Sequence, residues 1–311
     1  MGDGECDHVP LPGRGVHDTA MWQEYRVAAS IEEALDLLGR YQGEARLIAG
    51  GTDLVLQCQR GECPARVLVD VTRIPGLDRV EERGGWVYLG AAVTHAQAAA
   101  SSLVRRWGQL LARACGMIGG PQVRNMGTLV GNIVTALPAA DATLALTALD
   151  AEAEVASPQG RRWLPMQELH RDVGVCLVNP CVEMITQLRF RALGPEYGCA
   201  HQRIARRKEH ALPILNVGVV AALQDGRWHD VRIAIGPVAV KPLRVRSAEE
   251  MLEGQPAAAE AMRRAGELTA TMCQPRDSLL RGSREYRLGL AAVFVRRALE
   301  AISDQLSATS H

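Results

Sequence analysis

Hydrophobic positions along the chain follow two periods, one typical of helices and one typical of strands. Ser30 opens an amphipathic helix over about 31–38, and short strands are predicted at 46–49 and 66–71. A glycine turn and a helix that begins near residue 53 separate these strands. Helix, strand, glycine turn, helix and strand in this order predict a small parallel α/β unit.

The rest of the chain predicts a second region of mixed structure and then a C-terminal region with a hairpin. Thr94 matches a helix-capping box, and Asp225-Gly226 is a hairpin signal between two apolar runs. The predicted elements are strands at 86–93, 151–155, 184–190, 215–223 and 228–235 and helices at 103–117, 247–252, 256–272 and 283–302. Gly and Pro at 194 and 195 mark a change of composition, so we expect a domain boundary near residue 195.

Length and composition narrow the function classes. The 311 residues suffice for two domains of about 150 residues, and 47% apolar residues suffice for a packed core. The 35 basic and 35 acidic residues cancel, which argues against a nucleic-acid-binding surface at whole-chain level. Pro138 and Asp141 interrupt the longest apolar stretch, and residues 1–20 lack an apolar run. We therefore expect no membrane span and no signal peptide, hence a cytoplasmic protein.

The cysteines and histidines do not form a recognisable metal site. Cys58/Cys63 and Cys176/Cys181 are two C-x4-C pairs separated by more than a hundred residues, and no C-x-x-C occurs. The spacing therefore favours reduced thiols over metal ligands. The usual nucleotide, protease and esterase motifs are absent as well, so no catalytic residue is predicted.

Two glycine turns carry the candidate chemistry. The first consists of Ala49, Gly50, Gly51, Thr52 and Asp53 and lies where a strand passes into a helix. Glycines allow the backbone to approach an anion closely, and free N–H groups at a helix start point towards it. The turn thus predicts a phosphate site, although a purely structural turn would have the same sequence.

The second turn spans 127–132, and its N–H groups form a candidate nest for another phosphate. Thr135 and Asp141 follow at spacings that keep them near the same ligand. Since a carboxylate repels a phosphate, Asp141 is expected to accept a hydroxyl, such as a ribose or ribityl group. Two anion cradles with a hydroxyl acceptor predict a diphosphate-bridged nucleotide cofactor. Arg124 is either a cofactor contact or a salt-bridge partner that holds the loop.

Four segments together resemble a known family. They are LIAGGTDLVLQ (47–57), YLGAAVTHAQ (88–97), GPQVRNMGTLVGNIVTALPAADATLALTALDAEAEV (120–155) and RGSREYRLGLAAVFVRRALE (281–300). The chain resembles, from about residue 22 to 302, the FAD-binding medium subunit of molybdenum hydroxylases such as xanthine dehydrogenase and carbon monoxide dehydrogenase.

The resemblance implies an α+β protein with a two-subdomain FAD-binding fold of the vanillyl-alcohol-oxidase (PCMH) type and a C-terminal domain of small antiparallel sheet plus helices. The implied division is a loose arm over 1–19, an FAD-binding domain over 20–194 with subdomains of about 20–75 and 76–194, and a C-terminal domain over 195–311. The implied FAD contacts are Ala49, Gly50, Gly51, Thr52 and Asp53 at the diphosphate, Thr128, Leu129, Val130, Gly131 and Asn132 in the second cradle, Asp141 at a cofactor hydroxyl, Ile118 beside the flavin ring, and Val178.

The sequence departs from the family at two places. Leu137 precedes Pro138 where the family often has serine, which removes one hydroxyl contact. Before the hairpin, Arg206-Arg207-Lys208 is followed by Glu209-His210, without an acid at the family's usual position. The second departure bears on the contacts near the flavin ring and on the site of the electron acceptor.

The resemblance implies an electron-transfer subunit of a xanthine-dehydrogenase-like enzyme. FAD would receive electrons from [2Fe–2S] clusters on a small subunit, after substrate hydroxylation at molybdopterin on a large subunit, and NAD or another acceptor would take them. The implied assembly is a dimer of heterotrimers. Two alternatives stay open, namely a free-standing FAD-dependent oxidoreductase of the same fold and a scaffold subunit that has lost FAD.

Overall fold

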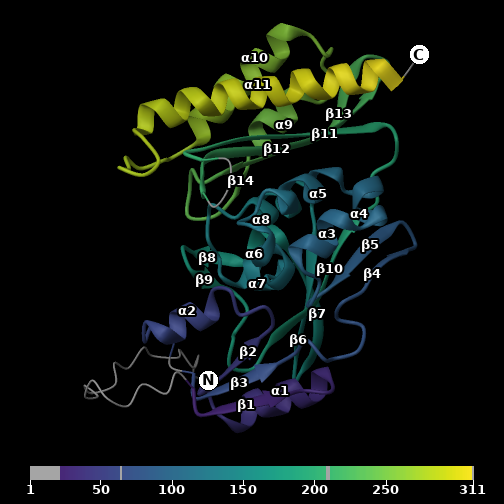
Figure 1. Cartoon of the computed structure of the whole chain (residues 1–311). Helices are drawn as coiled ribbons and strands as arrows, with labels where there is room; N and C mark the ends of the chain where they lie inside the picture. Colours follow the sequence, from purple (N-terminus) through teal and green to yellow (C-terminus); the bar gives the residue numbers. More distant parts are fainter. Residues whose placement is uncertain (1–21, 64, 208–210, 310–311) are drawn as a thin grey trace.

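A three-stranded parallel sheet forms one end of the molecule (Figure 1). The computed structural model describes residues 22–63, 65–207 and 211–309, so the predicted arm over 1–19 lies outside the described residues. The sheet has the order β1-β3-β2 and consists of β1 (Glu24–Val27), β2 (Ala45–Ile48) and β3 (Val67–Asp70). The connecting helices are α1 (Ile31–Arg40) and α2 (Leu54–Gln59). The predicted parallel α/β unit is confirmed, and β1 adds a strand that the sequence pattern did not predict.

The middle of the molecule is a five-stranded antiparallel sheet of order β4-β5-β10-β6-β7, with helices packed on one face (Figure 1). Its strands are β4 (Val80–Arg83), β5 (Trp86–Gly90), β6 (Glu152–Ser157), β7 (Gly160–Pro165) and β10 (Met184–Arg191). Its helices are α3 (His95–Ala100), α4 (Ser102–Trp107), α5 (Gln109–Gly116), α6 (Pro121–Met126), α7 (Leu129–Val134) and α8 (Asp141–Ala148). A short 3-10 helix, η1 (Met166–Glu168), and the small strands β8 (His170–Asp172) and β9 (Val175–Cys176) complete it.

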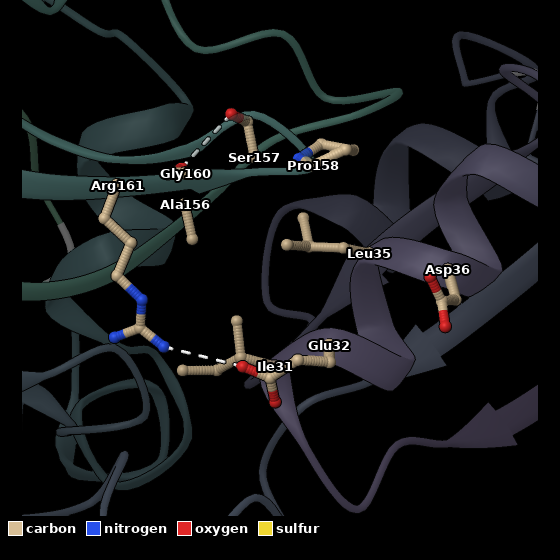
Figure 2. Close-up of a pocket in the computed structure, with 9 residues that line it drawn as sticks. All are labelled: Ile31, Glu32, Leu35, Asp36, Ala156, Ser157, Pro158, Gly160 and Arg161. Atoms are coloured by element: carbon tan, nitrogen blue, oxygen red, sulfur yellow. Dashed lines mark hydrogen bonds and ion pairs between the residues drawn. The ribbon is translucent and has the colours of Figure 1, made fainter.

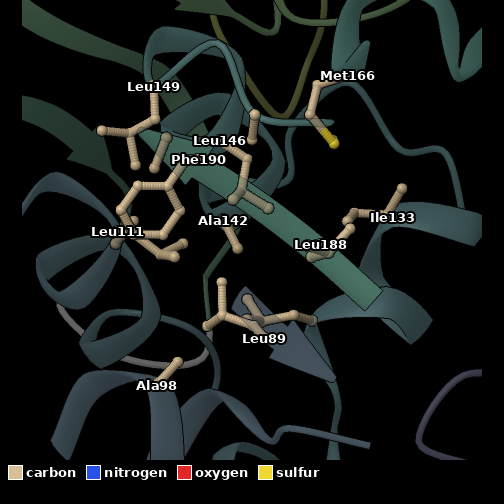
Figure 3. Packing of buried hydrophobic residues seen from close by; sticks show 14 of the residues in the cluster. Leu89, Ala98, Leu111, Ile133, Ala142, Leu146, Leu149, Met166, Leu188 and Phe190 are labelled. Carbon is tan, nitrogen blue, oxygen red and sulfur yellow. The ribbon is translucent and has the colours of Figure 1, made fainter. Parts of the chain in front are cut away.

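The helix predicted over 103–117 is wrong as a single element, because it breaks into α4 and α5 at Gly108. A Cβ at Gly108 would come within 2.7 Å of the Phe190 ring, so the chain turns where the core leaves no room for a side chain. Figure 3 shows Phe190 packed with Leu111, Leu149 and their neighbours in the buried cluster between sheet and helices.

The C-terminal part is a four-stranded antiparallel sheet covered by helices (Figure 1). Its elements are β11 (Tyr197–Ala205), β12 (Pro213–Gln224), β13 (Arg227–Gly236), β14 (Leu243–Arg244), α9 (Arg246–Leu252), α10 (Ala259–Met272) and α11 (Arg284–Thr309). The predicted hairpin is confirmed, with Asp225 and Gly226 both at positive φ in the turn between β12 and β13. A second buried cluster fills the space between this sheet and α10 and α11.

Candidate functional site

The first glycine turn leaves β2 after Ile48 and leads into α2. Gly51 has a φ of +67°, a conformation that side chains with a Cβ rarely adopt. A Cβ there would also lie 3.1 Å from Ile48 Cδ1 and 3.2 Å from Val55 Cγ2. The sequence therefore needs glycine at this position to turn from the sheet into the helix.

The backbone of this turn presents unsatisfied donors. Within the described part of the chain, the N–H groups of Gly50, Gly51, Thr52 and Asp53 donate to no backbone or side-chain acceptor. The surrounding residues are only half-buried or exposed, so these donors are open to a ligand. Consecutive free N–H groups of this kind form a concave site for an anionic oxygen.

The second turn is shorter than the sequence analysis expected. Its residues from Leu129 onward belong to α7, and only Gly127 and Thr128 have extended backbone. Thr128 caps the helix, since the Gly131 N–H donates to Thr128 Oγ1 at 3.0 Å. The Leu129 N–H donates to the Val93 carbonyl, so few donors of this segment stay free for a ligand. The expected cradle over 127–132 is thus largely a helix start held in the core, because Leu129 and its neighbours are buried.

The two turns contact each other directly, although 76 positions separate Gly51 and Gly127 in the sequence. A Cβ at Gly50 would overlap the Met126 carbonyl and would lie 3.0 Å from the Cα of Gly127. From the other side, a Cβ at Gly127 would lie 3.4 Å from Thr52 Oγ1. The first subdomain and the helical layer of the second therefore meet backbone to backbone at the candidate site.

Asp141 lies at the first position of α8 and is buried beneath the C-terminal sheet. Its carboxylate accepts from Arg203 Nε at 3.1 and 3.2 Å and from Asn216 Nδ2 at 2.6 Å. A carboxylate has about four acceptor positions, so one on Oδ2 remains for a ligand hydroxyl. Arg203 also neutralises the charge that would otherwise repel a nearby phosphate.

His201 lies beside this ion pair and is unusual for a buried polar group. Its Nε2 is 3.8 Å from Asp141 Oδ1, and neither ring nitrogen has a hydrogen-bond partner among the residues that the structure describes. Burial lowers the pKa of His201, and the nearby Arg203 and Arg113 guanidinium groups act in the same direction, while the Asp141 carboxylate opposes them.

The remaining predicted residues lie around α7 and differ in their contacts. Thr135 Oγ1 donates to the Gly131 carbonyl at 2.8 Å, and Asn132 Oδ1 accepts from Thr143 Oγ1 at 3.4 Å. Val130 is half-buried against the core. Ile118 and Val178 belong to the same buried cluster as the inner face of α7, and neither is in a described contact with the first turn.

Arg124 bonds to two backbone carbonyls and not to a carboxylate. Its Nη1 donates to the carbonyls of Ile118 and Gly119, at 3.0 and 3.1 Å, and so closes the loop before α6. The expected salt bridge is wrong, because no carboxylate among the described residues lies within ion-pair distance of this guanidinium. The Leu137-Pro138 departure lies after α7, whereas residues 208–210 of the second departure lie outside the described residues.

A separate cleft lies between α1 and the β6–β7 turn (Figure 2). Figure 2 shows Arg161 reaching across it towards Glu32, with 3.7 Å between Nη2 and Oε1. The cleft contains none of the predicted site residues. It is therefore not the site at which the two turns meet.

Four residues of the site escaped the sequence analysis, namely Met126, His201, Arg203 and Asn216. Met126 contributes only its carbonyl, which leaves no side-chain signal. The others lie on β11 and β12 and reach Asp141 across 60 to 75 positions of sequence. The only sequence signal for them is a basic residue shortly before the hairpin, and the basic run at 206–208 carries that signal more strongly than Arg203 does.

The described residues also bear on metal sites and membrane spans. No group of three or more His, Cys, Asp or Glu side chains is arranged to hold a metal ion within the described ranges. No helix in that same part of the chain has the length and apolar character needed to cross a membrane.

The chain matches two family models in succession. Residues 20–190 match the FAD binding domain in molybdopterin dehydrogenase, and residues 200–302 match the CO dehydrogenase flavoprotein C-terminal domain. Among known proteins, the nicotine 6-hydroxylase medium subunit of Paenarthrobacter nicotinovorans is 36% identical over 281 residues, which cover 88% of this chain and 95% of that protein. The carbon monoxide dehydrogenase medium chain of Hydrogenophaga pseudoflava is 30% identical, over 89% of this chain and 96% of that protein.

Solved structures agree with these matches. A chain of carbon monoxide dehydrogenase from Hydrogenophaga pseudoflava superposes with a TM-score of 0.87 at 30% identity, covering 91% of this chain and 98% of its own. A chain of quinoline 2-oxidoreductase from Pseudomonas putida 86 gives a TM-score of 0.84 at 25% identity, covering 91% and 97%. The likeness therefore extends over the FAD-binding part and the C-terminal part alike.

Proposed function

Because this chain belongs to the family of FAD-binding medium subunits of molybdenum hydroxylases, a family of oxidoreductases, we propose that it is the electron-transfer subunit of such an enzyme. In this proposal FAD takes electrons from [2Fe–2S] clusters of a small partner subunit and passes them to NAD or another acceptor. A large molybdopterin-binding subunit hydroxylates the substrate. The assembly is a dimer of heterotrimers, and its cytoplasmic location stays a prediction from the sequence.

The single observation that supports FAD at this site best is the row of free donors in the first turn. Four consecutive N–H groups without an acceptor need a partner, and diphosphate oxygens supply several acceptors at once. We assign Ala49, Gly50, Gly51, Thr52 and Asp53 to the diphosphate, as the family resemblance implies. The residues present thus fit the cofactor that the family carries.

The second turn is assigned a different part in holding FAD. Thr128, Leu129, Val130, Gly131 and Asn132 form a partly buried wall. The N–H groups of Thr128 and Val130 have no acceptor within the described residues. Ile118 and Val178 supply apolar surface from the same cluster. Thr135 keeps its hydroxyl on the helix backbone, so we assign it a supporting role.

Asp141 is proposed to accept a hydrogen bond from a cofactor hydroxyl through its remaining acceptor position. Arg203 and Asn216 fix the carboxylate on its other sides, so the acceptor is already oriented before the cofactor binds. When bound, the isoalloxazine supplies the redox chemistry, for which the protein needs few acids or bases of its own. This agrees with the absence of a predicted catalytic residue in the sequence.

The alternatives make different demands on the chain. A free-standing oxidoreductase would bind its own substrate, and it would not need the C-terminal domain of the carbon monoxide dehydrogenase flavoprotein type that residues 200–302 match. A scaffold subunit without FAD would not need the four free N–H donors of the first turn. Both features favour the electron-transfer subunit.

The test is purification of the tagged full-length chain from its own cells, followed by assays for released FAD, molybdopterin and iron–sulfur absorbance. We expect one FAD per chain, together with a large and a small polypeptide that carry the other two cofactors. Flavin on a lone chain that reduces a dye with its own substrate would favour the free-standing enzyme. Partners without flavin on this chain would favour the scaffold.

A further inference from the structure

Two adjacent leucines are presented to solvent on a tight turn before α11. The Leu279 residue is 96% exposed and Leu280 is 70% exposed. We call residues 278–282 the dileucine turn. Single exposed apolar residues are ordinary on protein surfaces, but two neighbouring leucines at this exposure are costly unless something covers them.

The dileucine turn is closed by hydrogen bonds of its own. Ser278 and Gly282 form a bridge, with N–H to carbonyl distances of 3.1 and 2.8 Å in the two directions. The N–H groups of Leu280 and Arg281 both donate to Ser278 Oγ at 3.2 Å. The backbone thus fixes the leucines at the apex, where they cannot fold back into the core.

The base of the turn is held from two sides. Arg206 Nη2 donates to the Leu279 carbonyl at 2.6 Å. Asp277 accepts from the Arg284 N–H at the start of α11, at 2.6 Å. A turn that is anchored in this way loses little conformational entropy when it inserts into a partner, which favours binding.

The surroundings of the leucines are basic. Arg206, Arg276 and Arg284 are exposed and Arg281 is partly exposed, against the two carboxylates of Asp277 and Glu285 in the same segment. None of these four arginines is in an ion pair with a carboxylate within the residues that the structure describes. An apolar apex with an unpaired cationic rim is complementary to an apolar pocket bordered by carboxylates.

The position of the turn relates it to the candidate site. Arg206, which holds the turn, follows Arg203 by three residues at the end of β11, and Arg203 holds Asp141. The exposed Leu212, 60% accessible, lies just before β12 at the same end of this sheet. The dileucine turn therefore lies at the same end of the C-terminal sheet as Arg203, but next to α11, whereas Asp141 at the start of α8 lies against the opposite face (Figure 1).

We propose that the dileucine turn docks this chain onto a partner subunit of the molybdenum hydroxylase, by inserting Leu279 and Leu280 into an apolar pocket whose rim carries carboxylates. This inference rests on the proposed function, because it requires a partner polypeptide in a stable assembly. Arg206, Arg276, Arg281 and Arg284 pair with the acidic rim.

The test uses the tagged full-length chain expressed in its own cells, with Leu279→Asp and Leu280→Asp combined. We expect the variant to keep its FAD content and melting temperature and to lose at least tenfold of the co-purified molybdopterin and iron–sulfur cofactor. Val27→Asp, at a half-exposed apolar position in the first subdomain, is the matched control and should keep the partners. Arg281→Glu should weaken co-purification less than the double variant. Its difference from the wild-type chain should shrink at higher salt, because salt screens the charge pairs.

Each other outcome has a defined meaning. Full partner stoichiometry in the double variant overturns the docking proposal and leaves the electron-transfer function intact. If the aspartates impair folding, Leu279→Gln with Leu280→Gln provides the same test without added charge. A wild-type homodimer that the variant dissolves would make a second copy the occupant, which contradicts the proposal. Wild-type chain recovered without molybdopterin and iron–sulfur partners would defeat the proposed function and this inference together.

Discussion

The two glycine turns meet at one site but differ in what their backbones do. The first turn, residues 49–53, leaves four consecutive N–H groups free and is partly open to solvent. The second, at Gly127 and Thr128, is buried. Of the N–H groups that follow it, that of Leu129 donates to the Val93 carbonyl and that of Gly131 donates to the helix cap at Thr128. Similar glycine-rich sequence thus leaves backbone donors free in one place and packs into the helical layer in the other.

This difference has a physical basis in the elements that follow each turn. Helix α2 buries only Cys58, whereas α7 buries Leu129 and Ile133 completely in the central cluster. Buried backbone groups must form hydrogen bonds within the protein, while groups at an open edge can bond to water or to a ligand. We therefore expect changes at the open positions of the first turn to reduce FAD affinity chiefly. Changes in the second turn, and at Gly50, which packs against it, should reduce stability first.

The largest effect is expected from Gly50→Val, which would remove the contact between the turns. The new side chain would overlap the backbone carbonyl of Met126, which cannot move like the end of a flexible side chain. Overpacking of this kind costs about 3 kcal/mol or more, and FAD binding should be lost with it. FAD released per purified chain and urea unfolding measure both effects.

Gly39→Val is the control for this prediction, because a Cβ at Gly39 in α1 meets nothing within 4 Å. Valine is a slightly better helix former than glycine, so this variant should keep or slightly raise the stability, with full flavin content. Full flavin occupancy in Gly50→Val would refute the geometry of the junction.

The second prediction concerns pH and the histidine behind the second turn. His95 is buried, and its backbone N–H donates to the Gly127 carbonyl at 3.0 Å. Burial, helped by the Arg124 charge, lowers the pKa of His95 from 6.5 to about 4. The folded chain therefore disfavours protonation of His95. The contribution of neutral His95 to the free energy of unfolding is fully present above pH 6.5 and is lost as the pH drops towards 4, by about 3 kcal/mol in all.

Urea unfolding at a series of pH values measures this slope. His95→Gln should be less stable at neutral pH and should flatten the pH dependence, because the titrating group is gone. An unchanged slope in His95→Gln would show that other groups carry the acid sensitivity.

The third prediction separates conformation from contact in the first turn. Gly51→Ala places a Cβ at φ +67° and within 3.2 Å of two side chains, which can yield slightly. We expect a loss of about 1–2 kcal/mol in stability and a clear weakening of FAD binding, since the free donors depend on this conformation. Isothermal titration of the flavin-free chain with FAD measures the second effect, and Gly39→Ala is the control. A variant with wild-type FAD affinity would mean that the donors keep their orientation.

The smallest effect is expected at the helix cap of the second turn. Thr128→Ala removes the acceptor of the Gly131 N–H, which should cost about 1 kcal/mol of stability. Ser30→Ala removes the corresponding cap of α1 and serves as the matched control. Both variants should melt earlier by a similar amount, and flavin content should fall only in Thr128→Ala. Equal flavin content in the two would make the second turn purely structural.

The sequence predicted the local elements well where local signals are strong. The turn at Asp225-Gly226, the capping box at Thr94 and the parallel unit around the first glycine turn are all confirmed. These features depend on neighbouring residues, so they can be predicted without the rest of the fold. The break at Gly108 could not, because its cause is the Phe190 ring from a strand 82 positions away.

The sequence by itself determined the glycine turns, the alternation of sheet and helix, and the resemblance to FAD-binding subunits that the family models confirm. Only the tertiary structure decided that Gly50 packs on Met126, that Arg203 and Asn216 hold Asp141, and that Leu279 and Leu280 stay outside the core. The physical reason is the separation along the sequence between the residues that make each feature. Turn geometry and helix caps arise within a few residues, whereas backbone contacts and buried ion pairs require strands and helices from distant positions to be packed first.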